Sequence, residues 1–298
     1  MKQLFSFLLF LLFLQLITNA CFSQNNIEKK VNLPDGYTSI IDAVYTRVGD
    51  WEGKMDLYVD LHSKQKLPVL LNIHGGGWNH GNKESQTGFN IFFKEKFAVA
   101  NVEYRLVQTA YAPGAIEDIR SAIEYLKVNH LKFNLDPDNI ILMGGSAGGH
   151  LALMGGLLGN DRRFDKYCKN DSTDMKIKAV IDKYGPVDFT KKDDKFYNYK
   201  SLIWWMGEKS DSSDFRRLIS PRTYISEKSP HILIIHGTDD PIVPYSQSVL
   251  LHNQLESNGV YNEFITIDGG LHGKFDKSDN ERINDSIIEF LKKIEVIE

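Results

Sequence analysis

The first residues that could carry chemistry are a serine and its neighbouring glycines. Ser146 lies in the run GGSAG at 144–148, which fits the pattern G-x-S-x-G, between an apolar run (140–143) and a stretch of helical composition (147–158). A sharp strand-to-helix turn holds such a serine in a strained conformation and lifts its hydroxyl into a cleft. Ser146 is therefore predicted to be a nucleophile for acyl transfer, with the N–H of Ala147 as one donor to the oxyanion. A plain glycine turn is the alternative, which the flanking pattern disfavours.

A second glycine run, HGGGW at 74–78, ends another apolar stretch upstream of the serine. Acyl transfer places negative charge on a carbonyl oxygen, and glycine-rich backbone can aim N–H groups at that charge. A phosphate-binding loop is the competing interpretation. The run lacks the lysine and hydroxyl residue of a P-loop, and it lacks the G-x-G-x-x-G spacing. We expect His74 to brace this loop rather than to act as a base.

An orienting acid and a base are expected on loops that follow two later apolar strands. Asp239 and Asp240 lie in the run HGTDDPIVP, and His272 lies in the run GGLHG. The carboxyl ends of parallel strands share one edge of a sheet, so these side chains can converge on the serine. The chain thus contains the three groups that nucleophilic catalysis by serine requires.

Other acids and histidines are weaker candidates. Asp188 follows another expected strand and is an alternative acid, because related folds can place the acid there. His80 and His150 are expected to be structural, and His252 is expected on the surface of a helix. The nine histidines form no H-E-x-x-H or similar spacing, so neither a metal site nor a cofactor is predicted.

In chain order, the runs HGGGW, GGSAGG, HGTDDPIVP and GGLHG resemble the hormone-sensitive-lipase-like and feruloyl/acetylxylan esterase branch of the α/β-hydrolases, over about residues 56–290. The order serine, acid, histidine is also the order found in α/β-hydrolases. The resemblance implies that the second of the two aspartates, Asp240, is the acid. It further implies that the N–H groups of Gly76, Gly77 and Ala147 are the oxyanion donors.

The same resemblance implies an activity. The expected function is that of an exported serine carboxylesterase acting through an acyl-enzyme on acetyl or feruloyl groups of plant or algal polysaccharide. The substrate would be a small ester or an esterified oligosaccharide. A peptidase like prolyl oligopeptidase, an amidase like arylformamidase and an inactive glycan-binding hydrolase fold are the alternatives. One local departure is Val107-Gln108 after the YRL run, where the family usually has proline and glutamate.

Apolar runs and helical patterns alternate along the chain, which predicts an α/β-hydrolase fold with a mostly parallel central sheet and helices on both faces. Residues 188–229 interrupt the alternation and are predicted to form a small cap insertion over the sheet. The strands are expected at 40–48, 54–61, 68–74, 97–102, 140–143, 178–184, 232–235 and 263–267, and the helices at 115–128, 147–158, 246–256 and 280–294.

The N-terminus predicts export. Lys2 is followed by an apolar run at 4–17 and then by polar residues, as in a secretory signal peptide ending near residue 23. Residues 24–298 would then form one catalytic domain in the periplasm or outside the cell. The apolar run is short for a membrane span, and an uncleaved anchor is the alternative. Cys21 follows a small residue, as in a lipoprotein, and its lipidation is the only membrane attachment that we expect.

Charge and cysteine content exclude some classes of protein. The 298 residues include 35 basic and 39 acidic ones, for a net charge of −4, and no basic patch stands out. A nucleic-acid partner is therefore not expected. Cys168 is the only cysteine besides Cys21, so the mature chain has no disulfide framework.

Overall fold

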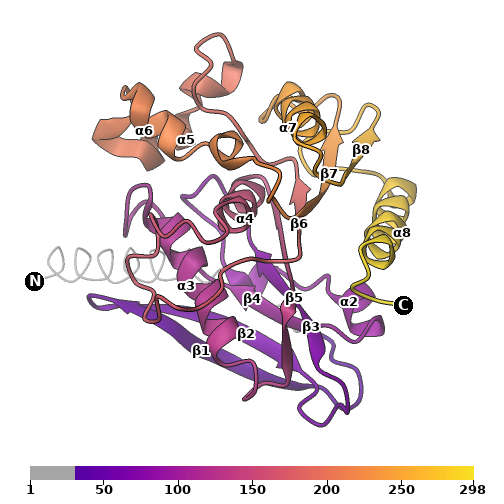
Figure 1. Ribbon diagram of the computed structural model, residues 1–298. Coiled ribbons are helices and arrows are strands. Elements are labelled where there is room, and N and C mark those ends of the chain that lie inside the picture. Colours follow the sequence, from indigo (N-terminus) through magenta and orange to yellow (C-terminus); the bar gives the residue numbers. More distant parts are fainter. Residues whose placement is uncertain (1–30) are drawn as a thin grey trace, which may run out of the picture. The chain divides into compact units, whose positions relative to one another are not determined.

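The computed structural model describes residues 31–298, which form one compact unit (Figure 1). Within these residues a single sheet of eight strands has the order β1-β2-β4-β3-β5-β6-β7-β8. β2 is antiparallel to both β1 and β4, and all other pairs are parallel. The strands are β1 (Thr38–Val48), β2 (Trp51–Val59), β3 (Leu67–Ile73), β4 (Ala98–Val102), β5 (Leu135–Gly145), β6 (Ala179–Lys183), β7 (His231–Gly237) and β8 (Asn262–Ile267). The predicted mostly parallel sheet is confirmed.

Helices cover both faces of this sheet, as predicted. One apolar cluster joins the sheet to α3, α4 and α7, and the other joins it to α2 and α8. The helices are α2 (Asn90–Lys94), α3 (Gly114–Val128), α4 (Ala147–Leu157), α5 (Lys200–Met206), α6 (Ser213–Leu218), α7 (Ser246–Ser257) and α8 (Lys277–Lys293), with short 3-10 turns η1 (Lys83–Ser85), η2 (Lys195–Asn198), η3 (Gly207–Lys209) and η4 (Pro221–Tyr224).

The sequence explains this layering. β4 and nearly all of β3 are buried, as expected for central strands with helices on both faces. α8 is amphipathic and buries Ile287 and Phe290, and the side chain of Asp276 caps its start by accepting from Asp279 N at 2.7 Å. α4 is buried all round. A Cβ on Gly156 of α4 would lie 2.6 Å from Val180 Cγ2, so only glycine lets this helix lie so close to the sheet.

Several elements differ from the expected ones, and β2 starts at Trp51 instead of 54. β5 starts at Leu135, five residues before the predicted strand. The early part was missed because residues 136–139 are polar and lack the apolar pattern from which a strand is predicted. α2 was not predicted, since five residues are too short to show a helical period. α8 starts at Lys277 instead of 280, and the capping side chain of Asp276 accounts for the earlier start.

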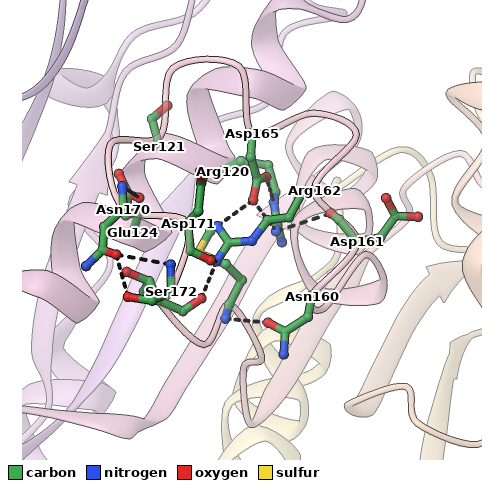
Figure 2. A network of polar contacts seen from close by, with 12 residues as sticks. Arg120, Ser121, Glu124, Asn160, Asp161, Arg162, Asp165, Asn170, Asp171 and Ser172 are labelled. Atoms are coloured by element: carbon green, nitrogen blue, oxygen red, sulfur yellow. Dashed lines mark hydrogen bonds and ion pairs between the residues drawn. The ribbon is translucent and has the colours of Figure 1, made fainter.

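A buried polar network holds the segment between α4 and β6 against α3 (Figure 2). Arg120 of α3 donates from Nε to Asp165 Oδ1 at 2.6 Å and from Nη2 to Asp165 Oδ2 at 3.1 Å. Its Nη1 also donates to the Gly155 carbonyl of α4 at 3.2 Å. One turn along α3, Glu124 accepts from the backbone N–H groups of Lys169 and Asn170. The network therefore fixes α4, the helix that follows Ser146.

Residues 188–229, the predicted cap insertion, contain η2, α5, η3, α6 and η4. Asp188 Oδ2 accepts from Arg222 Nη1 at 2.6 Å, which ties the two ends of the segment together. Trp205 of α5 is buried and stacks on Trp78 with ring centroids 4.6 Å apart. Trp204 is 49% exposed, so only one of the two neighbouring tryptophans is available to a ligand.

The predicted signal peptide (1–23) and Cys21 lie outside the described residues. Within residues 31–298, no helix is long and apolar enough to span a bilayer.

Candidate active site

Ser146 occupies a sharp turn between β5 and α4. β5 ends at Gly145 and α4 begins at Ala147. The backbone of Ser146 has φ 58° and ψ −124°, a region that non-glycine residues rarely adopt. Such a conformation costs about 1–3 kcal/mol and persists only where the surroundings enforce it. Here the Ser146 N–H donates to the Lys183 carbonyl at 2.9 Å.

The glycines around this turn are required by close backbone contacts. A Cβ on Gly144 would overlap the backbone of Gly148, and one on Gly148 would overlap the carbonyl of Ile73. A Cβ on Gly75 would lie 2.8 Å from the Gly145 carbonyl oxygen. The run at 74–78 and the serine turn are therefore pressed together, which requires small residues on both sides.

His272 and Asp240 complete a hydrogen-bonded chain with Ser146. His272 Nε2 lies 2.9 Å from Ser146 Oγ, and His272 Nδ1 lies 2.6 Å from Asp240 Oδ2. Because a carboxylate only accepts, Nδ1 carries the proton of a neutral imidazole and Nε2 accepts from the hydroxyl. Ser146 and Asp240 lie at the ends of β5 and β7, and His272 lies on the loop after β8. The structure thus brings the three predicted residues together.

Asp240 is held in its charged form. Burial raises the pKa of its carboxyl, but hydrogen bonds from His236 and His272 and from the Ile242 N–H outweigh burial and hold the pKa well below its usual range. Oδ1 accepts from the N–H groups of Ile242 and Val243 at 2.8 and 3.0 Å. A carboxylate with this many donors can fix an imidazole and stabilise its protonated form.

His236 is a second partner of Asp240 that the sequence did not reveal. It is fully buried, and its Nε2 lies 3.2 Å from Asp240 Oδ2 and 3.0 Å from the Val243 carbonyl. Because that carbonyl only accepts, Nε2 carries the proton. Its Nδ1 lies 2.7 Å from Ser248 Oγ. His236 therefore positions the Asp240 carboxylate, and it makes no hydrogen bond to the predicted nucleophile Ser146.

The alternative acids lie elsewhere. Asp239 is exposed, and its carboxylate accepts from the Thr238 hydroxyl at 3.3 Å. Asp188 pairs with Arg222 and accepts from the Thr190 hydroxyl at 2.7 Å. Neither residue is hydrogen-bonded to His272 within the described chain.

The alternative histidines also have other partners. His74 stacks on Tyr104 with ring centroids 4.3 Å apart, and burial lowers its pKa to about 4. Its Nδ1 lies 2.7 Å from the Gly75 carbonyl, as expected of a residue that braces the glycine run. His150 Nε2 donates to the Ile219 carbonyl at 2.9 Å, and burial lowers its pKa to about 4. His252 Nδ1 lies 2.7 Å from Asn262 Oδ1, and His80 Nδ1 lies 2.5 Å from Asn79 Oδ1.

The three predicted oxyanion donors lie around the serine. Gly76 and Gly77 have φ values of 118° and 55°, which favour glycine, and both line a cavity together with Ser146. Within residues 31–298 their N–H groups donate no hydrogen bond, whereas the Gly76 carbonyl accepts from Asn79 and His80. Ala147 is the first residue of α4, and an N–H at that position has no acceptor inside its helix. These are the free donors that a developing oxyanion requires.

Val107 and Gln108, where the sequence departs from the family pattern, hold the glycine run. The Val107 N–H donates to the Trp78 carbonyl at 2.9 Å, and Gln108 Nε2 donates to the Asn79 carbonyl at 2.8 Å. The side chain of the same Asn79 donates from Nδ2 to Ser201 Oγ of α5 at 2.9 Å. Both the loop after β4 and the 188–229 segment therefore support the oxyanion loop.

The cavity at the serine has a volume of about 330 Å³. Besides the glycine loop and His272, its lining includes Gln86, Lys183, Tyr184 and Tyr199. Tyr199 comes from the 188–229 segment, so that segment contributes to the pocket. In residues 31–298, no group of histidine, cysteine and acidic side chains could hold a metal ion.

Tyr184 and Lys183 were also not predicted as site residues. The ring of Tyr184 lies 4.8 Å from the imidazole of His272, measured between centroids, and its φ of 47° is unusual for a residue with a side chain. Both residues lie at the carboxyl end of β6, the edge where sites form in such sheets. That position was the one signal in the sequence that pointed to them.

Comparisons with known proteins agree with this fold. The family model BD-FAE matches residues 55–255, and the model of TAP-like proteins matches residues 217–296. The chain is 31% identical over 195 residues to LipM, a probable carboxylic ester hydrolase of Mycobacterium tuberculosis, covering 63% of this chain and 45% of that protein. The chain spans about half the length of the curated relatives it matches.

Two solved structures are similar over most of the chain. A truncated carbohydrate esterase from gut microbiota is 28% identical with a TM-score of 0.75, covering 88% of this chain and 99% of that one. A bifunctional GH43-CE protein of Bacteroides eggerthii is also 28% identical, with a TM-score of 0.72, covering 85% of this chain and 38% of that one. The BD-FAE match spans more than half of the sequence and includes the serine turn. The chain belongs to the BD-FAE family of α/β-hydrolases.

Proposed function

We propose that this protein is a serine carboxylesterase that works through an acyl-enzyme. The observation that carries the proposal is the hydrogen-bonded chain from Asp240 through His272 to Ser146, which ends in a cavity beside free backbone N–H groups. Named relatives support the same activity, since LipM is described as a probable carboxylic ester hydrolase.

In the first half-reaction, Ser146 Oγ attacks the carbonyl carbon of the ester while His272 Nε2 takes the hydroxyl proton. Asp240 stabilises the imidazolium that forms. The negative charge on the carbonyl oxygen is met by the N–H groups of Gly76, Gly77 and Ala147, and loss of one such donor costs about 10²–10³ in rate. The bond to the alcohol oxygen then breaks, and His272 returns the proton to the leaving alcohol.

In the second half-reaction, a water molecule attacks the acyl-enzyme. His272 takes one proton from the water, and the water oxygen bonds to the acyl carbon. The bond to Ser146 Oγ breaks, the serine regains its proton from His272, and the free acid leaves. The three side chains end in the state in which they began.

The proposed substrates are acetyl or feruloyl esters of plant or algal polysaccharide. One similar structure is a truncated carbohydrate esterase from gut microbiota and another is the bifunctional GH43-CE protein, and the first of these supports a carbohydrate ester. The cavity lining is rich in polar groups, including Gln86 and Tyr199, as suits a hydroxylated substrate.

Export to the periplasm or beyond is part of the proposal, since polysaccharide lies outside the cytoplasm. It is supported by the basic start and the apolar run of residues 4–17. Intact mass measurement of the protein from cell fractions tests this part. Loss of about 20 N-terminal residues is expected, and a lipid mass on Cys21 would identify a lipoprotein.

The experiment for the activity is hydrolysis of short and long p-nitrophenyl esters, methyl ferulate and acetylated xylan by wild type and by Ser146→Ala. Activity on acetate and ferulate that disappears in the variant is expected. Asp240→Asn tests the acid in the same assay. Asp239→Asn is its matched control, because Asp239 is the neighbouring carboxylate in the chain but is exposed. Turnover of lipid esters alone would reject the polysaccharide substrates.

An active-site fluorophosphonate separates the remaining alternatives. A folded wild type that labels at Ser146 but cleaves only amides would be a peptidase or amidase. A folded wild type that neither labels nor cleaves any ester would be a glycan-binding hydrolase fold. Either result would reject the esterase proposal.

A further inference from the structure

Lys183 is one of the residues that line the active-site cavity. It is the last residue of β6, in register with Gly145 of β5 and Ile235 of β7. Side chains alternate along a strand, so Lys183 shares a face with Ile181, which belongs to the apolar cluster under α2 and α8. The lysine is partly buried there.

The lysine also borders a second cavity. Lys183, Tyr184 and Gly273 line the cavity at the serine, and the same three residues line a second cavity of about 160 Å³. The second cavity is bounded by apolar side chains such as Met143 and Ile287 and by polar ones such as Asn280 and Asn284. Lys183 therefore borders both the cavity at the serine and the cavity beside α8.

No acid of the described chain neutralises this lysine. Within residues 31–298, Lys183 Nζ has no carboxylate within 4.0 Å and its side chain makes no hydrogen bond. Lys83 shows the usual arrangement, with Asp42 and Asp56 oxygens each 2.9 Å from its Nζ and a Glu84 oxygen at 2.7 Å. Lys183 therefore has none of the acidic partners that surround the ammonium group of Lys83.

The nearest acids in the sequence and in the site are unsuitable as partners. Asp182 precedes Lys183 on the strand, so its side chain points to the opposite face, and burial raises the pKa of its carboxyl well above the usual range. Asp240 is hydrogen-bonded to His236 and His272. Burial lowers the pKa of Lys183, with no opposing effect from an acid. A bound anion would reverse that shift.

We infer that Lys183 binds a carboxylate carried by the ester substrate, an inference that rests on the proposed esterase function. A single ammonium group matches one negative charge, and no arginine lines either cavity, so a carboxylate fits better than a doubly charged phosphate. The carboxylate can belong to the acyl group, as in a hemiester of a diacid, or to the alcohol, as in an ester of a uronic acid residue. In both cases the site selects acidic over neutral esters.

The test compares kcat/KM for two matched pairs of esters. Mono-p-nitrophenyl succinate and p-nitrophenyl butyrate differ in a carboxylate on the acyl group. 3-Acetoxybenzoate and 3-acetoxybenzamide differ in a carboxylate on the alcohol. In one pair we expect Lys183→Met to reduce the acid-to-neutral ratio about ten- to hundredfold, the effect of losing a hydrogen bond to a charged group. The pair that responds identifies the side of the ester that carries the charge.

Lys178→Met is the matched control. Lys178 immediately precedes β6, is also partly buried, and lies at the opposite end of the strand beside a different cavity. The ratio should not change in this variant, whereas Lys183→Arg should retain most of the preference for the acid. If Lys183→Met leaves the acid-to-neutral ratio of kcat/KM unchanged in both pairs of esters, the inference is wrong.

Binding to Ser146→Ala provides a readout that does not need turnover. Calorimetric titration should show tighter binding of 3-acetoxybenzoate than of 3-acetoxybenzamide, or of the succinate ester than of the butyrate ester, and the difference should vanish in Ser146→Ala/Lys183→Met. If wild type hydrolyses no ester, the proposed function fails, and these titrations still decide the role of Lys183. Equal binding within both pairs rejects it.

Discussion

The ring of Tyr184 lies against the imidazole of His272, with ring centroids 4.8 Å apart at an interplanar angle of 59°. Tyr184 reaches this position from a backbone with φ 47°, and its N–H donates to the Ile235 carbonyl at 2.7 Å. Burial and the nearby Asp240 carboxylate raise the pKa of Tyr184 to about 12. The Tyr184 hydroxyl therefore stays protonated near neutral pH. Tyr184 contributes to the site by packing its ring against the imidazole of His272, which holds the imidazole in position.

Removal of that ring should slow catalysis. We expect Tyr184→Ala to lower kcat on p-nitrophenyl acetate by about tenfold to a hundredfold, because a small displacement of a catalytic group costs rates of this order. Tyr184→Phe retains the ring and should stay within about threefold of wild type, because within residues 31–298 the Tyr184 hydroxyl makes no hydrogen bond that the change would remove. If Phe and Ala are equally slow, the hydroxyl rather than the ring is the contributing group.

Replacement of Asp240 by asparagine should lower kcat far more. An amide in place of Oδ2 can donate to His272 Nδ1, which moves the imidazole proton to Nε2 and prevents that atom from accepting the serine proton. A loss of about 10³–10⁴ in kcat is expected, as in serine proteases with the same change. The measurement is kcat on p-nitrophenyl acetate beside Asp239→Asn, which should remain close to wild type. A similar loss in both variants would contradict the assignment of Asp240.

Asp240 should also make the fold sensitive to acid. Its pKa is lower in the folded protein than in the unfolded chain, so the unfolded chain binds the proton first as the pH falls below about 4. The stabilisation is complete above the unfolded pKa and is lost as the pH falls through the folded pKa. Urea denaturation at pH 7 and pH 3 should therefore show the difference in unfolding free energy between wild type and Asp240→Asn becoming smaller in acid. A difference that stays constant would mean that the carboxylate is not stabilised by the fold.

Much of the fold was predictable because continuous apolar runs define central strands. The run at 68–74 predicted β3 (Leu67–Ile73), and the run at 232–235 predicted β7 (His231–Gly237), each to within about two residues. The start of β5 was not predictable from the polar segment with Asp136 and Asp138, because the strand begins where Leu135 pairs with Leu67 of β3, a contact distant in sequence.

The candidate site was predictable where a motif follows a strand. Ser146, Asp240 and His272 each lie after a different strand of the parallel sheet, and shared topology then brings them to one edge. Tyr184 belongs to no such motif, and His236 begins the run HGTDDPIVP but lies within β7 rather than on the loop after it. Their roles depend on a positive φ and on a buried contact with Asp240, and neither property follows from residue spacing.

The buried pair of Arg120 and Asp165 provides a test of what holds α4 in place (Figure 2). The Arg120 side chain is fully buried, and it also donates to the Gly155 carbonyl of α4. Removing one partner of a buried ion pair leaves the other charge without compensation, so Arg120→Met should lower the unfolding free energy by about 3–5 kcal/mol. Arg162 Nη1 lies 2.9 Å from Asp165 Oδ2 and keeps part of the compensation, which favours the lower end of that range.

An exposed pair in the same segment is the control for Arg120. Arg163 Nη2 lies 2.8 Å from Asp161 Oδ2 near the surface, so Arg163→Met should cost less than about 1 kcal/mol. Urea denaturation followed by circular dichroism measures both variants. Arg120→Met should also lower kcat on p-nitrophenyl acetate in the folded state, because α4 begins directly after Ser146. Equal losses of stability in the two variants would contradict the importance of the buried pair, and an unchanged kcat would show that α4 holds its position without it.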